Sequence, residues 1–271
     1  MKRGRIAAFV LLAWVVASLC APWLAPAPYE RIDLANRFEA PSPAHLLGTD
    51  ELGRDLLSRL LYGGRVSLSV AAACVAISLF AGGLLGAVAG YRGGTLDFIF
   101  GRIVDILMAL PGLLLAIAIV AYVGRGLGAL VFALCATAWV GYARVARSLS
   151  LSFGNRPFSE AARVAGATQW RVLQSHIIPN VAPLLLVQSA AGAAGVMLSE
   201  AGLSFLGLGI QPPYPSWGAT LSAGCDVLLE APHLAIAPGA LLFIVVWSLQ
   251  ALGEAGSEQM DPRRRNALVR L

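Results

Sequence analysis

The chain has 271 residues, of which 58% are hydrophobic and only 13% are charged, and its mean hydropathy is +0.73. This composition excludes a soluble globular domain, in which about a quarter of the residues are charged. The net charge of +5 does not indicate nucleic-acid binding, because the basic residues are spread through short loops and both termini. That distribution is typical of a membrane protein whose basic residues set its orientation.

The apolar residues fall into blocks of about 20, the length with which an α-helix crosses a bilayer. We therefore expect an all-α membrane protein. The blocks predict six transmembrane helices, at residues 6–24, 66–89, 103–123, 129–143, 182–208 and 234–252.

These blocks divide the chain into three parts. Residues 1–24 form a basic tail and the first transmembrane helix, residues 25–65 form a long polar loop outside the cytoplasm, and residues 66–271 form a core of five transmembrane helices. The basic start followed by an apolar run is also compatible with a cleaved signal peptide. The length of the run and the missing small-residue cleavage site favour an uncleaved helix.

Within the polar loop, residues 51–61 predict an amphipathic helix that lies at the membrane interface. Its apolar face consists of Leu52, Leu56, Leu57, Leu60 and Leu61, and its polar face of Arg54, Asp55 and Arg59.

The next two spans carry distinctive small residues. Gly82, Gly86 and Gly90 stand four residues apart, and such ridges let transmembrane helices approach closely. Residues 91–101 are expected to form a short loop. Pro111 is expected to kink the third span.

Residues 157–183 interrupt the apolar second half of the chain and predict two short helices around a glycine. Ser159 can cap the first helix, and Gly166 can take the left-handed conformation that ends it. Thr168 can cap the second helix, which Pro179 would stop. Exposed tryptophan and arginine together are typical of protein interfaces, so the segment is either a connector or a docking surface. The residues expected on its exposed face are Arg163, Gln169, Trp170 and Arg171.

Two acidic residues lie inside predicted spans, Asp105 in the third and Glu200 in the fifth. Against lipid they would be costly, so each should face protein or a water-filled path. They belong either to a translocation path or its gate, or to helix packing in which Arg or Ser groups partner them. Asp97 and Asp226 lie nearer the membrane surface and are expected to be solvated.

Charge counting predicts the orientation. Six spans place both termini on one side, together with the loop after the second span and the segment 157–183. These four regions hold three, two, five and four basic residues in the order N-terminus, loop, segment and C-terminus, which is fourteen of the 20. The positive-inside rule therefore predicts that both termini and residues 157–183 are cytoplasmic.

Several kinds of chemistry are excluded by what the sequence lacks. A phosphate-binding loop needs a lysine after its glycines, but Lys2 is the only lysine, so ATP hydrolysis must take place on another polypeptide. No histidine shares a span with a serine, cysteine or metal-binding partner, so we expect no catalytic residue and no metal site. The cysteines are expected to be small buried hydrophobic residues without disulfide spacing. They are Cys20, Cys74, Cys135 and Cys225.

The order of residues in the segment 157–183 carries a family resemblance. The order Glu160-Ala161-Ala162, three intervening residues, Gly166, nine intervening residues and His176-Ile177-Ile178-Pro179 resembles the EAA loop of ABC-importer permease subunits. The run G-T-D-E-L-G-R-D at 48–55 and the segment from L-S-F-L-G-L-G at 203–209 to P-S-W-G at 215–218 look like the dipeptide, oligopeptide and nickel branch of that family. Glu254 after Gly253 departs from the aspartate that is usual there but keeps its charge.

The resemblance covers nearly the whole chain and is closest to the second, C-type membrane subunit. It implies the type I importer permease fold, localisation in the bacterial cytoplasmic membrane and transport of peptides. It also implies a second permease subunit in a heterodimer, two ATPase subunits that carry ATP and Mg, and an extracytoplasmic solute-binding protein. Its implied ATPase-coupling residues are Glu160, Ala161, Ala162, Gly166, Trp170, Arg171, His176 and Pro179.

Three alternatives remain at this stage. Import of nickel or a metal chelate would use the same kind of subunit, because selectivity in such systems rests largely with the binding protein. A passive channel or secondary transporter would use the same spans but would give the segment 157–183 no task. An intramembrane enzyme would need a nucleophile and a base that the sequence does not provide.

Overall fold

The computed structural model describes residues 2–260, which form helices and no β-strand. The elements are α1 (Lys2–Leu19), α2 (Ala21–Leu24), η1 (Leu34–Asn36), α3 (Leu56–Arg92), α4 (Gly94–Ala109), α5 (Gly112–Val123), α6 (Leu127–Gly154), α7 (Pro157–Val164), α8 (Gln169–Val172), η2 (Leu173–Ile177), α9 (Ile178–Phe205), α10 (Trp217–Asp226) and α11 (His233–Met260).

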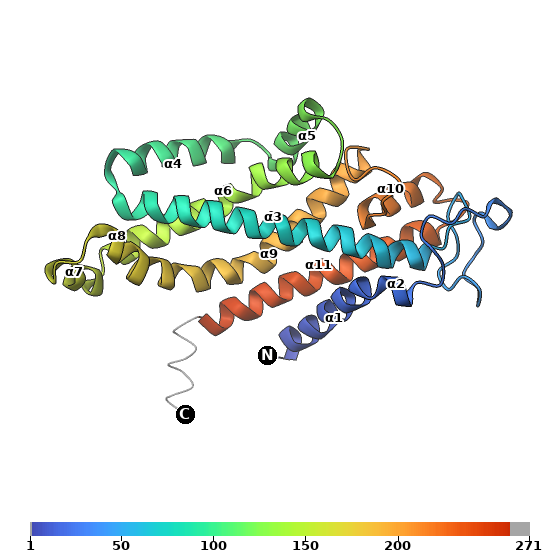
Figure 1. Cartoon of the computed structure of the whole chain (residues 1–271), viewed down its shortest axis with the longest axis horizontal. Coiled ribbons are helices and arrows are strands. Elements are labelled where there is room, and N and C mark those ends of the chain that lie inside the picture. Colours follow the sequence, from blue (N-terminus) through green and yellow to red (C-terminus); the bar gives the residue numbers. More distant parts are fainter. Residues whose placement is uncertain (1, 261–271) are drawn as a thin grey trace.

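Four long helices, α3, α6, α9 and α11, form the body of the molecule (Figure 1). The short helices α7 and α8 lie at one end of this body, and the irregular segment 25–55 lies at the other. We call residues 157–177 the knob and residues 25–55 the loop end. The start of α1 and the end of α11 both point toward the knob half (Figure 1). The predicted basic tail at 261–265 lies outside the described residues.

Four helical stretches of residues 2–260 are long and apolar enough to cross a membrane alone, namely α3, α6, the run Gln169–Phe205 and α11. The pair α4–α5 passes the same test together, but its two helices meet at an angle of 88°. The first expected span corresponds to α1, which is not one of the four and packs along α11 and α3.

The glycine ridge of α3 packs closely on another helix, as its spacing predicted, and the partner is the backbone of α6. A Cβ atom added to Gly82, Gly86 or Gly90 would overlap a carbonyl oxygen of α6. The three oxygens belong to Trp139, Ala143 and Arg147, which are also four residues apart. Since both series rise along the chain, α3 and α6 are parallel and in register, and the ridge brings their backbones into contact.

The expected interfacial helix at 51–61 is wrong. Helix formation begins at Leu56 and continues without a break to Arg92, so the predicted leucines from Leu56 onward belong to the long helix α3, whereas Leu52 lies in a turn before it. Leu56 and Leu60 are buried in the main apolar core and do not rest on lipid. The helix starts there because Asp55 accepts a hydrogen bond from the backbone N–H of Ser58 and caps it.

The third span also differs from expectation. Residues 91–101 are not a loop, because α3 ends at Arg92, Gly93 turns the chain with a φ of 66°, and α4 starts at Gly94. Pro111 does more than kink a helix. Leu110 is extended, at φ −90° and ψ 133°, as the residue before a proline prefers, and α4 and α5 become separate helices.

Candidate functional site

The knob is formed by two short helices that the sequence specifies locally. Helix α7 begins at Pro157, a residue well suited to the first turn, and ends before Gly166, whose φ is 87°. Thr168 caps α8 as predicted, by accepting a hydrogen bond from the N–H of Arg171. The predicted cap at Ser159 is wrong. Its side chain is buried and donates to the carbonyl oxygen of Phe153 at 2.8 Å, which fastens α7 to the end of α6.

The predicted stop at Pro179 is also wrong. The chain passes from α8 through a π-helical turn, Leu173–Ile177, directly into α9, with Pro179 in the first turn of α9. Proline is tolerated there because the first turn of a helix needs no donor from it. The wider turn is defined by the N–H of Ile178, which bonds to the carbonyl oxygen of Leu173. The knob is therefore continuous with a long helix of the bundle.

Apolar side chains anchor the inner face of the knob. Val172, Leu173 and Ile177 are almost completely buried and pack in one cluster with Tyr142 and Ala146 of α6. His176 stacks on Phe158 of α7, with ring centroids 6.4 Å apart. The two knob helices are thus attached to each other and to the bundle.

The outer face of the knob carries large apolar groups in contact with solvent. Trp170 is 51% exposed and Val164 is 90% exposed. Arg163, Gln169 and Arg171 are exposed as predicted. Glu160, Ala161, Gly166 and Pro179 are exposed as well, whereas Ala162 and His176 are half-buried. Sequence reasoning missed Val164 and the partly exposed Phe158, although an apolar residue just before the glycine that ends α7 was a usable signal.

Glu200 has a different environment. Only 1% of its surface is exposed. Ser67 of α3 donates to its Oε2 at 3.3 Å, and Ser204, one turn along α9, donates to its Oε1 at 3.0 Å. The hydroxyl of Ser67 also accepts the backbone N–H of Trp217 at 3.2 Å. Glu200 therefore joins α3, α9 and the start of α10, an arrangement that favours its packing role over a place in a pathway.

Trp217 completes this junction. The side chain is fully buried, and its indole N–H donates to the carbonyl oxygen of Leu60 at 2.8 Å. A Cβ added to Gly64 would come within 2.9 Å of its ring. The P-S-W-G sequence thus closes the loop after α9 against the first turns of α3.

Asp105 and its neighbour Asp97 lie on α4 in contrasting surroundings. Asp97 is not solvated as expected, because it forms a two-pronged ion pair with Arg147 of α6, at 2.5 and 2.7 Å. Asp105 is exposed, and within residues 2–260 it makes no ion pair within 4 Å. The structure does not bring Asp105 and Glu200 together, since they lie on different helices and only Glu200 is buried.

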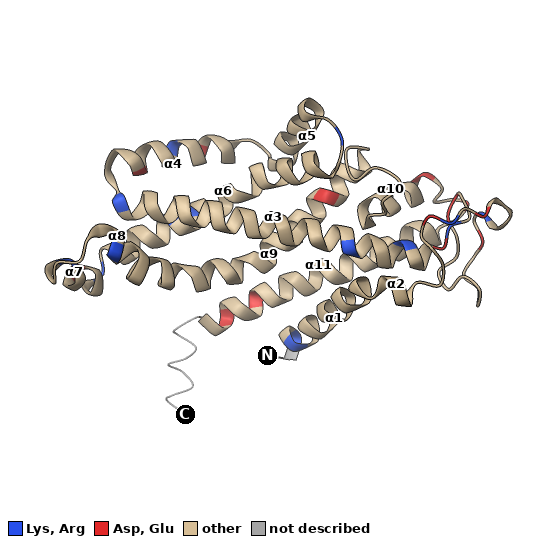
Figure 2. Cartoon of the chain, viewed as in Figure 1, with Lys and Arg blue, Asp and Glu red and all other residues tan. Residues whose placement is uncertain are grey.

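Charges are otherwise concentrated at the two ends of the bundle (Figure 2). At the loop end, Asp50 binds Arg54 at 2.7 Å and Arg59 at 3.4 Å. Asp55 binds the side chains of His45 and Ser58, at 3.0 and 2.7 Å.

The surroundings of this ion-pair group are tightly packed. Gly53 has a φ of 70°, and a Cβ there would overlap the backbone carbonyl of Asp33. A hydrogen bond to Glu30, with burial, raises the pKa of Tyr29 in the same region to about 12. The G-T-D-E-L-G-R-D run is therefore held in its conformation by ion pairs and close packing within the loop end.

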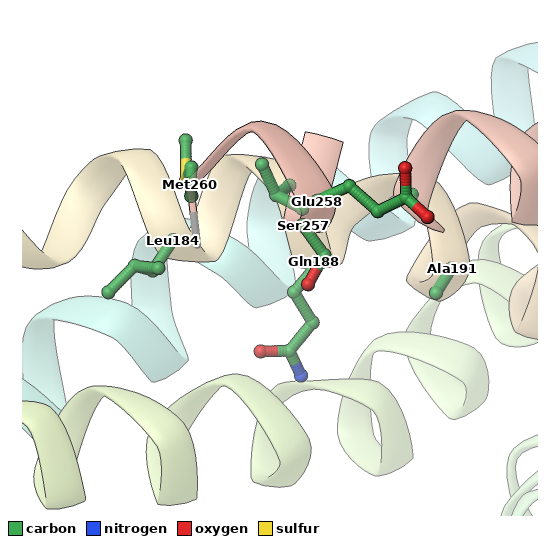
Figure 3. Close-up of a pocket in the computed structure, with 8 residues that line it drawn as sticks. Leu184, Gln188, Ala191, Ser257, Glu258 and Met260 are labelled. Atoms are coloured by element: carbon green, nitrogen blue, oxygen red, sulfur yellow. The ribbon is translucent and has the colours of Figure 1, made fainter. Parts of the chain in front are cut away.

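A surface pocket of about 640 Å³ opens between α9 and α11 in the knob half (Figure 3). Leu184 and Met260 lie at one end of it, and the carboxylate of Glu258 extends toward Ala191 at the other. None of the predicted site residues lines this pocket, and the sequence did not indicate it. Its lining is Leu184, Val187, Gln188, Ala191, Gly253, Ser257, Glu258 and Met260.

The similarity to known proteins covers nearly the whole chain. Residues 82–266 match the model of the family described as binding-protein-dependent transport system inner membrane component. The oligopeptide transport system permease protein OppC of Haemophilus influenzae is 37% identical over 97% of this chain and 86% of its own length. The dipeptide transport system permease protein DppC of Bacillus subtilis is 35% identical over 98% and 84%.

Two further comparisons agree with these. The glutathione transport system permease protein GsiD of Pectobacterium atrosepticum is 39% identical over 95% of this chain and 86% of its own length. A solved chain of the inward-facing MetNI methionine ABC transporter superposes with a TM-score of 0.59 at 22% identity, over 74% of this chain and 94% of that one, so the fold is shared. The chain thus belongs to the family of binding-protein-dependent transport system inner membrane components.

Proposed function

We propose that this chain is a permease subunit of an ATP-binding cassette importer that moves short peptides across the cytoplasmic membrane. The observation that carries the proposal is the exposed knob face, with Trp170 half-exposed and Val164 almost fully exposed at the tip of an otherwise anchored element. An aromatic and an aliphatic group beside arginines suit a protein partner. The chain has no phosphate-binding loop, so that partner supplies the ATPase.

The orientation follows from charge. With the knob in the cytoplasm, fourteen of the 20 basic residues lie on the cytoplasmic side. The start of α1 and the end of α11 point to the same half (Figure 1). The loop end then lies outside, where an extracytoplasmic solute-binding protein would deliver the cargo.

In this assembly the knob acts as a lever. Glu160 and Arg171 would make polar contacts in a groove of the ATPase, while Ala161 permits its close approach and Ala162 permits that of α7 to the inner cluster. The π-turn and Pro179 continue into α9, and His176 holds α7 against that turn, so movement of the knob is passed to a transmembrane helix. Closure of two ATPase subunits would thereby rock this chain against a second permease subunit, by rigid-body alternation of access.

The partners in this proposal are a second permease in a heterodimer, two ATPase subunits with their ATP and Mg, and the binding protein, with no role for nucleic acid. Peptides are preferred over nickel or a metal chelate because the relatives named above belong to oligopeptide, dipeptide and glutathione systems. Exposed Asp105 fits a translocation path better than buried Glu200 does.

The test replaces Gly166 with tryptophan. Gly166 has a left-handed φ, and a Cβ added to it would meet nothing of this chain within 4 Å, so a large side chain there projects toward a partner. We expect Gly166→Trp to insert normally and to abolish ATP-driven peptide uptake by the reconstituted transporter. Uptake at the wild-type rate by this variant would remove the lever role from the knob.

A further inference from the structure

Helix α4 presents two different exposed faces, and only one of them suits lipid. Ile99, Ile103 and Ile106 are 54%, 47% and 65% exposed and form an apolar stripe at helical spacing. About a quarter turn away, Phe98, Arg102 and Asp105 share a second stripe that carries both signs of charge. The guanidinium of Arg102 lies 5.1 Å from the ring centroid of Phe98, so these two side chains share a face.

Helix α6 adds a further cation beside this second stripe. Arg144 is exposed, and its Nη1 lies 3.5 Å from the sulfur of Met108, one turn beyond Asp105 on α4. Asp105 lies one turn before Met108 and Arg144 contacts Met108, yet within residues 2–260 the two charges form no ion pair. The nearby Asp97 and Arg147, by contrast, form an ion pair, and Arg147 also attracts Asp105 electrostatically.

Asp105 lies at membrane depth. It follows Asp97, the partner of Arg147, by eight residues, which is about 12 Å along the helix toward the loop end. Its neighbour Val104 packs with Val140 and Ala143 of α6, next to the region where the glycines of α3 contact the α6 backbone. An exposed carboxylate at this depth must face water or another protein group, because contact with lipid is costly.

We infer that Asp105 and Arg144 form a cargo-contacting site for peptides with charged side chains on the wall of the translocation path. Asp105 receives cationic groups of the passing peptide, and Arg144, whose guanidinium lies at Met108, receives anionic groups. Charge-assisted hydrogen bonds of this kind are stronger than neutral ones, so the loss of either charge should weaken the passage of peptides of the opposite charge. This inference rests on the proposed function, because it assumes that peptides pass this face.

The first experiment tests whether position 105 is in contact with water in the assembled transporter. In a variant with all four native cysteines replaced by alanine, Asp105→Cys and Ile106→Cys are treated with a membrane-impermeant charged thiol reagent in the assembled transporter. Ile106 is the matched control because it is adjacent, exposed and on the apolar stripe. We expect Asp105→Cys to react at least about tenfold faster, because thiolate chemistry needs water. Equal rates, or reaction only after the two permeases are separated, would overturn the inference.

The second experiment tests whether Asp105 and Arg144 distinguish transported peptides by their charge. Uptake of Lys-Lys, Ala-Ala and Glu-Glu is measured with saturating binding protein for Asp105→Asn, Arg144→Gln and the control Asp226→Asn, whose exposed aspartate lies on α10. We expect Asp105→Asn to reduce Lys-Lys uptake about tenfold more than Glu-Glu uptake, the loss of one charge-assisted hydrogen bond. Arg144→Gln should show the opposite preference, and Asp226→Asn should show none.

The remaining outcomes are also decisive. Equal losses for all three peptides would overturn the cargo site and leave the proposed function standing, whereas a wild-type transporter that takes up none of them would overturn the proposed function itself. If Asp105→Asn does not assemble, Asp105→Glu takes its place. This variant keeps the charge, so a ratio of Lys-Lys to Glu-Glu uptake equal to that of the wild type supports the site, and a ratio lowered about tenfold overturns it.

Discussion

The loop end and the knob are the two polar parts of this membrane protein, and they use their polar residues in opposite ways. At the loop end, Asp50 and Asp55 are 8% and 2% exposed, and their carboxylates bind residues of the same segment or of the first turns of α3. In the knob, Glu160 and Arg171 are exposed beside Trp170 and Val164. The charged groups of the loop end bind partners within this chain, whereas those of the knob are exposed and available to a partner protein.

Two glycines show the same difference between the loop end and the knob. Gly53 and Gly166 both have left-handed φ angles, 70° and 87°. Around Gly53 the chain leaves no room, because a Cβ would overlap the carbonyl of Asp33, whereas a Cβ on Gly166 would meet nothing of this chain within 4 Å. A glycine in a motif that resembles the family can therefore be required either by the fold of its own chain or by the approach of a partner chain.

The largest effect is expected at Gly53. Replacing it with alanine adds the strain of a left-handed φ and forces the Asp33 backbone away, which breaks the hydrogen bond from Asp33 N to Leu52 O. We expect a loss of about 3 kcal/mol of stability, measured by thermal unfolding of the purified subunit complex.

Gly93 provides the control for Gly53. Its φ is 66°, but a Cβ there meets nothing within 4 Å, so Gly93→Ala isolates the backbone strain of about 1 kcal/mol. Equal destabilisation by the two alanines would mean that the crowding around Gly53 has no energetic weight.

A smaller effect, and one on binding only, is expected in the knob. Trp170→Ala and Val164→Ser remove exposed apolar surface, so the unfolding temperature should stay unchanged while affinity for the ATPase falls by about 2 kcal/mol for the tryptophan. Co-purification and titration with the ATPase measure this. Val123→Ser, at the exposed end of α5, serves as the control for Val164→Ser. A drop in unfolding temperature without a change in ATPase affinity would contradict the division between the two ends.

The sequence was a good guide at several positions where local rules decide the structure. The glycine spacing predicted close helix packing, and Gly166 and Thr168 predicted the end of α7 and the start of α8, although the cap at Ser159 and the stop at Pro179 were wrong. It was a poor guide where tertiary contacts override the pattern. The leucines from Leu56 onward have amphipathic spacing, yet Leu56 and Leu60 are buried because the long helix that Asp55 caps packs in the core of the bundle.

Side-chain partners from distant elements were beyond reach from one sequence. The pairing of Asp97 with Arg147 joins residues 50 positions apart, and the contact of Ser67 with Glu200 joins residues 133 apart. Cys74 and Cys135 likewise pack in one core cluster, although their spacing gave no sign of it. The 88° turn between α4 and α5 depends on Pro111 and on what α5 packs against, and proline alone predicts only that the helix is disturbed.

The smallest effect separates two helix caps, one at each end. Asp55 caps α3 through a buried hydrogen bond of 2.8 Å to Ser58 N, and Thr168 caps α8 through an exposed one of 3.3 Å to Arg171 N. We expect Asp55→Ala to lower stability by about 1–2 kcal/mol and Asp55→Asn by less, because asparagine still caps a helix. Thr168→Ala should cost about 0.5 kcal/mol, since water can replace the lost acceptor. Thermal unfolding measures all three, and a Thr168→Ala loss as large as that of Asp55→Ala would show that the knob, too, depends on its own polar contacts for stability.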